Sequence, residues 1–332
     1  MNIETTANET YLPGMTSAER VVALLPSATE IVAALGCASR LVGRSHECDY
    51  PSGVESLPVC TRPRVELGGS SAEIDASVRN AVKDAVAIYE VLEDQLQSLA
   101  PDVIVTQSQC EVCAVSFEEV EAAVASWSGC AVALVSLEAS TLNDVYDDIM
   151  RVAEVLGVAE AGDELVTAMT NRAMAVADFA EEIDVSPRVA CIEWSEPLMA
   201  AGNWIPEMVS LAGGRNLFGE VGGHAPELAW EELLEADPEV IILMPCGFDL
   251  KQTIGEVETF LAKPGWDNIT AVKTGRVYAT DANAFFNRPG PRLADSLEML
   301  AEILHPNAFQ FGHKDTGFQR VGKDTGNADL ET

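Results

Sequence analysis

One long segment without proline constrains the fold of this chain more than any other feature of the sequence. It covers residues 158–184, and its only interior glycine, Gly162, lies in the first turns. Its apolar residues recur at steps of three and four, which places them on one stripe of a single helix. These residues are Leu165, Val166, Met169, Ala173, Val176, Phe179 and Ile183. At about 1.5 Å per residue the helix would be roughly 35 to 40 Å long, enough to cross a small domain. Because Pro187 then ends it before a new strand, we predict a helix that bridges two lobes.

The composition supports two lobes and excludes two classes of partner. A chain of 332 residues with 48% hydrophobic content can bury two cores, each in a domain of about 150 residues. The net charge of −33, from 53 acidic and 20 basic residues, repels nucleic acids and anionic membranes at long range. Acidic residues are spread over nearly every predicted helix and lysine is scarce, which is typical of a halophilic protein's solvated surface. A large acidic face that binds a partner would give a similar pattern.

The N-terminal residues predict that the chain, as written, is not exported. Residues 1–20 are polar and contain neither an apolar signal core nor a cysteine for lipid attachment. We therefore expect a cytoplasmic protein, or one at the extracellular face of the membrane if a signal is missing from this sequence. No segment approaches the ~20 consecutive apolar residues of a membrane span. Eight cysteines without the spacing of a disulfide scaffold indicate free thiols in a reducing compartment.

Strands and helices alternate before the bridging helix. The predicted strands cover residues 20–25, 41–44, 103–106 and 131–135, and the predicted helices cover residues 28–35, 70–99, 116–127 and 142–156. The first helix follows Pro26 and has Ser27 and Glu30 at the spacing of a capping box. Such alternation predicts a mostly parallel, doubly wound α/β sheet.

The same pattern restarts after the bridging helix. A strand at 188–192 and a helix at 206–213 that ends in glycine parallel the start of the first lobe. Further strands are predicted at 240–244 and 277–279, and further helices at 227–235 and 292–304. The predicted fold class is therefore α/β, with two doubly wound lobes joined by a single long helix and a ligand cleft between the lobes. The predicted parts are a flexible N-terminus at 1–19, lobes at 20–157 and 187–306, the bridging helix at 158–186, and a flexible tail at 307–332.

Polar loops follow most of the predicted strands and form the candidate functional site. They cover residues 45–51, 107–113, 193–204, 245–249 and 281–291. In open α/β sheets, ligands bind outside the carboxyl ends of the strands, where these loops lie. For His46, in the first of these loops, the alternative is a hydrogen-bonded histidine in a capped turn.

Several segments in combination resemble one family. They are LLPSATEIVAALG at 24–36, RSHECDYP at 44–51, LAPDVIVTQ at 99–107, GNWIPEMVSLAGG at 202–214, and FFNRPGPRLADSLEMLAEILHP at 285–306. Together they resemble the cobalamin-binding, helical-backbone class (class III) of ABC-transporter substrate-binding proteins, from about residue 20 to residue 306. SHECDYP with CEVCAV at 110–115 is similar to a subgroup whose members often lack an export signal, and the acidic composition favours a haloarchaeal source. The resemblance implies that one long helix joins the lobes, so that they open by only a small angle.

The resemblance also implies reversible, non-catalytic binding of cobalamin or a related corrinoid in the cleft, with no cofactor required. A corrinoid is broad, partly apolar and rimmed with amides, so its site needs aromatic faces and hydrogen-bonding groups. The candidate ligand-binding residues are Pro26, Ser27, Tyr50, Gln107, Trp194, Asn203, Trp204, Phe248, Phe286 and Arg288. Of these, Tyr50, Trp204 and Phe286 lie in segments that match aromatic positions of the family. The alternative for Trp194 and Trp204 is a packing role.

The resemblance leaves two roles open, an importer's substrate-binding protein or an intracellular corrinoid-binding homologue. An importer's protein would bind ABC permease and ATPase subunits. Exported members present one carboxylate per lobe to arginines of the membrane partner, and the matching positions here are Asp94 and Glu231. An iron-complex binding protein, for a siderophore or a haem-like solute, is an alternative function.

A second hypothesis places a metal or redox site at the same loops. Its candidate ligands are His46, Cys48, Cys110, Cys113 and Cys246. The spacing of Cys110 and Cys113 lets two thiolates share a soft metal ion, and neutral His46 is a candidate ligand for the cobalt of a bound corrinoid. The alternative is that the cysteines are small buried hydrophobic residues. The sequence has no dinucleotide, Walker or nucleophile-elbow motif, so we expect no enzyme.

The charge predicts that the fold depends on salt. Repulsion among 53 acidic residues is screened to within about 10 Å only near 0.1 M salt or above. The melting temperature should therefore fall as the salt concentration is lowered from molar to millimolar. Thermal denaturation monitored by circular dichroism measures this, and a melting temperature independent of salt would contradict the halophile interpretation.

Overall fold

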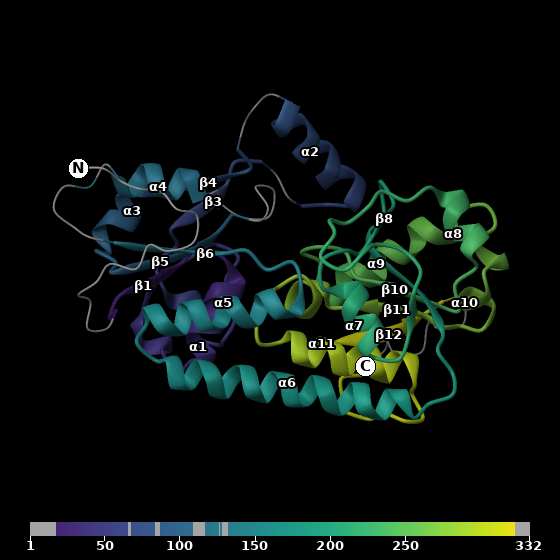
Figure 1. Cartoon of the computed structure of the whole chain (residues 1–332). Coiled ribbons are helices and arrows are strands. Elements are labelled where there is room, and N and C mark those ends of the chain that lie inside the picture. Colours follow the sequence, from purple (N-terminus) through teal and green to yellow (C-terminus); the bar gives the residue numbers. More distant parts are fainter. Residues whose placement is uncertain are drawn as a thin grey trace, which may run out of the picture. The chain divides into compact units, whose positions relative to one another are not determined.

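The computed structural model describes residues 18–65, 68–83, 87–108, 117–125, 127 and 132–322 (Figure 1). The chain divides into two compact units. The first lobe consists of Met1–Glu66, Val78–Glu138 and Val145–Thr167, and the second lobe consists of Leu67–Ser77, Ala139–Asp144 and Ala168–Thr332. Both lobes share the helix α6 (Ala159–Glu181), close to the predicted bounds of the bridging helix. The sequence did not predict that residues 67–77 and 139–144 belong to the second lobe.

The first lobe alternates short strands with helices, as predicted. Its strands are β1 (Val21–Ala23), β2 (Leu41–Arg44), β3 (Thr61–Pro63), β4 (Tyr89–Val91), β5 (Val103–Gln107) and β6 (Ala133–Leu137). Its helices are α1 (Pro26–Ala34), η1 (Ala38–Arg40), η2 (Val54–Ser56), α3 (Glu93–Ser98) and α4 (Phe117–Ala125), and α2 (Ser71–Lys83), α5 (Leu142–Val155) and α6 contribute in part. Among the described residues, none of the helices combines the length and hydropathy that a bilayer-spanning helix needs.

The central sheet of the first lobe is fully parallel, in the order β2-β1-β5-β6. All residues of β1 and β5 are buried, as expected for parallel strands that are covered on both faces. In Figure 1, α3 and α4 lie above this sheet, and α1 and α5 lie below it. The prediction of a doubly wound sheet is therefore confirmed for this lobe.

The predicted helix at 70–99 is helical in α2 (Ser71–Lys83) and α3 (Glu93–Ser98), but it is wrong at the strand β4 between them. The helix α2 ends at Lys83, and the strand β4 pairs antiparallel with β3. Tyr89 is buried on this strand pair, and Glu90 forms an ion pair with Arg62 at 2.8 Å. Pairing with a strand from another part of the chain thus overrides the local helical pattern, a contribution that a sequence window does not contain.

The second lobe has a mixed sheet. Its strands are β7 (Arg188–Trp194), β8 (Met199–Ala200), β9 (Arg215–Asn216), β10 (Val240–Leu243), β11 (Val277–Thr280) and β12 (Phe318–Val321). Its helices are α7 (Ile205–Leu211), α8 (Trp230–Ala236), α9 (Leu250–Leu261), η3 (Trp266–Asn268), α10 (Thr270–Lys273), the π-helix η4 (Ala282–Phe286) and α11 (Leu293–Leu304). The sheet order is β12-β11-β10-β7-β8, with β9 also paired to β7, and β8 and β12 are the antiparallel strands.

The parallel strands of the two lobes share one topology. In the first lobe the order is β2-β1-β5-β6. The second strand of this sheet in the chain, β2, lies on one side of β1, and the third and fourth, β5 and β6, lie on the other side. In the second lobe the parallel strands β9, β7, β10 and β11 have the same relation. The repeated strand and helix that the sequence showed at residues 20 and 188 therefore mark two lobes of similar design.

Residues up to 322 contribute to the second lobe's core, although the sequence predicted a loosely ordered tail at 307–332, of which residues 323–332 lie outside the described residues. β12 pairs antiparallel with β11, and Phe318 and Val321 are buried. The nearly buried carboxylate of Glu302 accepts hydrogen bonds from the backbone N–H groups of Phe311, of Gly312 at 2.7 Å and of His313 at 3.1 Å. A single side chain of α11 therefore holds the turn that leads to β12.

Replacing Glu302 should release this turn. Glu302→Ala leaves three backbone donors without their acceptor, so we expect the free energy of unfolding to fall by about 1 to 3 kcal/mol. Hydrogen exchange at residues 311–313 should become faster, as measured by mass spectrometry. Glu302→Gln keeps one acceptor oxygen, so its free energy of unfolding should fall less than that of Glu302→Ala. Wild-type exchange rates in Glu302→Ala would contradict this role.

Candidate functional site

The shared topology defines one candidate binding edge in each lobe. In a parallel sheet with this order, the connections from the first strand and to its other neighbour run on opposite sides of it. The place where the strand order reverses is the switch point, and ligands bind there, outside the carboxyl ends of the strands. In the first lobe this switch point lies between β1 and β5, and in the second lobe it lies between β7 and β10. Half of the ten candidate ligand-binding residues end or follow these four strands.

An aromatic pair lies at the switch point of the second lobe. Trp194 ends β7 and Phe248 follows β10, and their rings meet edge to face with centroids 5.6 Å apart. Phe248 is buried at 4% exposure, whereas Trp194 is partly exposed. The backbone carbonyl of Phe248 accepts a hydrogen bond from the Asn283 N–H at 2.9 Å. Phe248 thus packs against the Trp194 ring, and Trp194 offers apolar surface at the edge of the sheet.

Charged and amide groups lie beside this aromatic pair on the π-helix η4 and the loop after it. Asp281 accepts the Ala284 N–H at 2.9 Å and so caps η4. Burial, and then the charge of Asp249, raise the pKa of Asp281 against the opposing effect of Arg288 and Arg292. Arg288 is 5% exposed and donates to the Asn283 amide oxygen at 3.2 Å. The second lobe therefore combines an aromatic surface with hydrogen-bonding groups.

Two candidate aromatic residues of this lobe are buried. The indole N–H of Trp204 donates to the Phe286 carbonyl at 3.0 Å, and the two side chains are 5% and 0% exposed. Asn203, beside them, has a left-handed backbone with φ of 52°. Its N–H donates to the Gly223 carbonyl at 2.6 Å. In this structure these residues join α7 to η4, and a contact with ligand stays a prediction.

Polar residues also lie at the switch point of the first lobe. Pro26 begins α1, Ser27 is 1% exposed, and Gln107 ends β5 at 7% exposure. The hydroxyl oxygens of Ser27 and Thr106 are buried without a hydrogen-bond partner among the described residues. Such atoms are uncommon in proteins and carry a free-energy cost of about 1 to 3 kcal/mol each. Sequence reasoning missed Thr106, and its polar character within an apolar strand was the available signal.

The loop after β2 carries His46 and is held rigidly. The Arg44 guanidinium donates to the carbonyl oxygens of Ser45 at 2.9 Å and Cys48 at 3.1 Å. Tyr89 donates to the Glu47 carboxylate at 3.3 Å, and its ring centroid lies 5.4 Å from that of His46. Burial, and then the charge of Arg44, lower the pKa of His46, so its imidazole is neutral near pH 7. Tyr50, in the same loop, is 47% exposed.

The structure describes only some of the cysteines of the predicted metal site. Cys48 is 1% exposed and its sulfur accepts the Thr29 hydroxyl at 2.9 Å. Cys246 is partly exposed and follows β10 in the second lobe. Cys110 and Cys113 lie outside the described residues. A site that contains them therefore stays a prediction.

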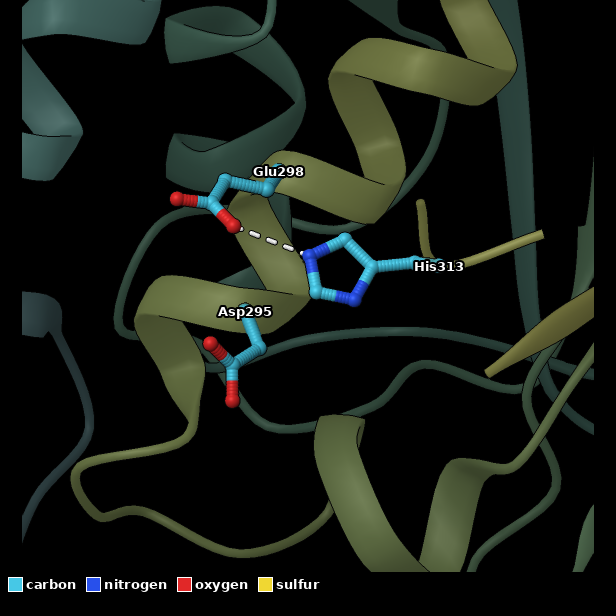
Figure 2. Close-up of side chains that lie close together, drawn as sticks. All are labelled: Asp295, Glu298 and His313. Carbon is cyan, nitrogen blue, oxygen red and sulfur yellow. Dashed lines mark hydrogen bonds and ion pairs between the residues drawn. The ribbon is translucent and has the colours of Figure 1, made fainter. Parts of the chain in front are cut away.

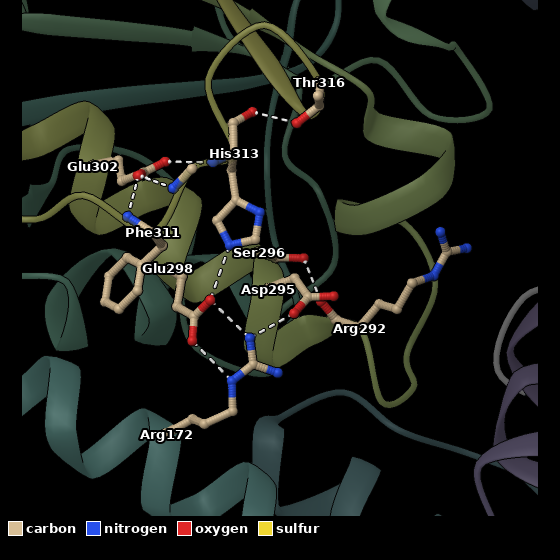
Figure 3. Close-up of polar contacts among 10 residues, drawn as sticks. Arg172, Arg292, Asp295, Ser296, Glu298, Glu302, Phe311, His313 and Thr316 are labelled. Carbon is tan, nitrogen blue, oxygen red and sulfur yellow. Dashed lines mark hydrogen bonds and ion pairs between the residues drawn. The ribbon is translucent and has the colours of Figure 1, made fainter.

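Within the part of the chain that the structure describes, one group of side chains has metal-ligand geometry. Asp295 and Glu298 of α11 and His313 have ligand atoms within 4.8 Å of one another (Figure 2). Figure 3 shows that Arg172 of α6 already contacts this group. Its guanidinium lies 2.5 Å from Asp295, and 2.8 and 2.7 Å from the two oxygens of Glu298. Since the Arg172 guanidinium already contacts both carboxylates, the group is an ion-pair network that joins α6 to α11.

Arg172 should contribute measurably to stability. Arg172→Met removes charged hydrogen bonds to two carboxylates, and we expect the free energy of unfolding to fall by about 1 to 2 kcal/mol after allowance for solvent screening. The Arg62–Glu90 pair is more exposed, so Arg62→Met is a matched control whose free energy of unfolding should fall less than that of Arg172→Met. Chemical denaturation measures both variants. Equal losses would contradict the network's role.

The raised pKa of Asp281 predicts a pH effect. A carboxyl with a raised folded-state pKa stabilises the fold most below its ordinary pKa, and this stability is lost as pH rises through the raised value. The free energy of unfolding of wild type, relative to Asp281→Asn, should therefore fall as the pH rises above about 4, the ordinary pKa of an aspartate. Hydrogen bonds from Thr270 lower the pKa of Asp237, so the difference for Asp237→Asn should have the opposite sign. Denaturation across this pH range measures both, and the same sign for the two variants would refute the assignment.

Comparison with known proteins gives the class of this chain. A family model described as periplasmic binding protein matches residues 21–284. Because the match covers most of the 332 residues, the chain belongs to the periplasmic binding protein family. Two doubly wound α/β lobes and the long helix α6 agree with the helical-backbone class, class III. The predicted fold class is thus confirmed, and the chain is a solute-binding protein.

Of three similar proteins, two are named for the solute that they bind. An uncharacterised ABC transporter substrate-binding lipoprotein, YvrC of Bacillus subtilis, is 24% identical over 299 residues, covering 88% of this chain and 82% of that protein. A vitamin B12-binding protein of Vibrio cholerae is 23% identical over 290 residues, covering 86% of this chain and 89% of that protein. The crystal structure of a periplasmic heme-binding protein from Pseudomonas aeruginosa has a TM-score of 0.66 at 21% identity and covers 88% of this chain and 94% of that chain. At this identity the structural likeness supports the fold alone.

Proposed function

We propose that this protein binds cobalamin or a related corrinoid reversibly and without catalysis, through the switch-point loops of its lobes. The observation that carries the proposal is the aromatic pair Trp194 and Phe248 beside Arg288, Asn283 and Asp281. Vitamin B12-binding relatives that match most of the chain support the same solute class.

The chemistry of a corrinoid fits these groups. Its macrocycle is flat and partly apolar, and it would lie against the partly exposed ring of Trp194. Its rim carries amides, which accept hydrogen bonds from a guanidinium and donate them to a carboxylate.

We propose further that the protein delivers its solute to an ABC permease with its ATPase. The supporting residues are Asp94 in the first lobe and Glu231 in the second. Both are exposed and lie in the first turn of a short helix, α3 and α8 respectively. A carboxylate presented by each lobe is suited to arginines on a membrane partner.

The alternative solutes are haem and other iron complexes. The observation that favours them is the similarity to heme-binding proteins of the same fold. Haem carries carboxylates on its rim where a corrinoid carries amides. The buried Arg288 suits a carboxylate, whereas Asp281 would repel it when ionised.

Calorimetric titration with cyanocobalamin, haemin and a ferric hydroxamate tests the proposal, in a buffer with high salt. We expect cyanocobalamin to bind and Trp194→Ala to weaken binding by about ten- to a hundredfold, the loss that removal of a central aromatic contact produces. Phe179→Ala is the control, because Phe179 is an exposed aromatic residue outside the switch-point loops. Absence of binding both by cyanocobalamin and by a corrinoid without a nucleotide base would refute the corrinoid proposal, and binding of haemin instead would favour the alternative.

A further inference from the structure

The hydrogen bonds around His46 fix the position of its imidazole. Arg44 clamps the carbonyl oxygens of residues 45, 46 and 48. The Ser45 N–H donates to the Ala23 carbonyl at the end of β1 at 2.8 Å. The His46 N–H donates to the Thr61 hydroxyl oxygen at 3.1 Å. The loop is thereby tied to β1, a strand of the first lobe's switch point.

One ring nitrogen of His46 is tied to the same hydroxyl. Nδ1 lies 2.8 Å from the Thr61 oxygen, and the Thr61 hydroxyl donates to the Ser45 hydroxyl oxygen at 3.0 Å. Thr61 and Ser45 are 1% and 2% exposed, so this chain of hydrogen bonds is shielded from water. With the Thr61 hydroxyl donating to Ser45, Nδ1 of the neutral ring donates to Thr61. The lone pair of the neutral ring then lies on Nε2.

The other ring nitrogen is accessible. Among the described residues Nε2 of His46 has no hydrogen-bond partner, and it is not one of the buried unpaired atoms. The side chain is partly exposed. A histidine that binds a metal typically donates its second ring N–H to a fixed acceptor, which orients the ring and raises its basicity. Thr61 is such an acceptor.

We propose that Nε2 of His46 is an axial ligand to the cobalt of a corrinoid with an exchangeable axial position. This proposal rests on the proposed function and narrows the solute to corrinoids whose own base does not occupy the cobalt. In the binding step the bond between Co(III) and a water molecule breaks and the bond between cobalt and Nε2 forms. The water leaves intact, and neither a proton nor an electron is transferred. Thr61 acts as a positioning residue.

Aquocobinamide tests this step, because it is a corrinoid without a nucleotide base. Its visible spectrum should change on binding to the wild-type protein. After reduction to Co(II), the electron paramagnetic resonance lines should each split into three through coupling to one nitrogen. His46→Ala should lose the splitting and bind aquocobinamide at least about tenfold more weakly. Free imidazole should restore the splitting in that variant. His224→Ala, at an exposed histidine of the second lobe, should behave as wild type.

Cyanocobalamin separates ligation from general binding. Cyanide and its own base fill both axial positions of its cobalt, so His46→Ala should change its affinity much less than that of aquocobinamide. Thr61→Val should weaken aquocobinamide by about tenfold, the lower end of the effect of removing a metal ligand's hydrogen-bond partner. The same variant should leave the affinity for cyanocobalamin unchanged. If Thr61 had a purely structural role, Thr61→Val would weaken the binding of both corrinoids.

Each outcome distinguishes this inference from the proposed function. Aquocobinamide binding without nitrogen splitting in wild type would overturn the ligation and leave corrinoid binding intact. Absence of binding by both corrinoids would overturn the proposed function and the ligation together. Binding of haemin with an imidazole spectrum that His46→Ala abolishes, but no corrinoid binding, would overturn the assignment to cobalt.

Discussion

The buried first strand of each lobe is the constraint on which the rest of the structure depends. β1 pairs with parallel strands on both sides, and β7 has parallel neighbours in β9 and β10. Because the first strand has a parallel neighbour on each side, the chain adds the next strand on one side of it and a later strand on the other side. This change of side leaves an opening at the carboxyl ends of the strands. The position of the candidate site follows from this topology.

Burial gives the loops at these openings their chemical character. Phe248 is buried against the Trp194 ring, and the buried Arg288 acts on the partly buried carboxyl of Asp281. In the first lobe, burial of Thr61 and Ser45 fixes the ring of His46. Groups held in this way do not reorganise when a solute binds, so little conformational entropy is lost.

Arginine has a structural role in this acidic chain. With 20 basic against 53 acidic residues, a guanidinium can satisfy several acceptors at once. Arg44 holds carbonyl groups of the His46 loop, and Arg172 forms ion pairs with two carboxylates of α11 (Figure 3). A planar guanidinium with five donors suits such positions better than a single ammonium group.

The sequence by itself determined the long helix, the two α/β lobes and the loops that carry the candidate site, because periodic burial and strand-to-helix succession are local patterns. It did not determine which side chains of those loops meet. Several contacts join distant parts of the chain. They are the hydrogen bond from Trp204 to Phe286, the hydrogen bond between His46 and Thr61, and the hydrogen bonds from residues 311–313 to Glu302. The strand β4 and the strand β12 likewise exist because they pair with β3 and β11. Only the tertiary structure decides these contacts, since their free energy arises from residues that no sequence window brings together.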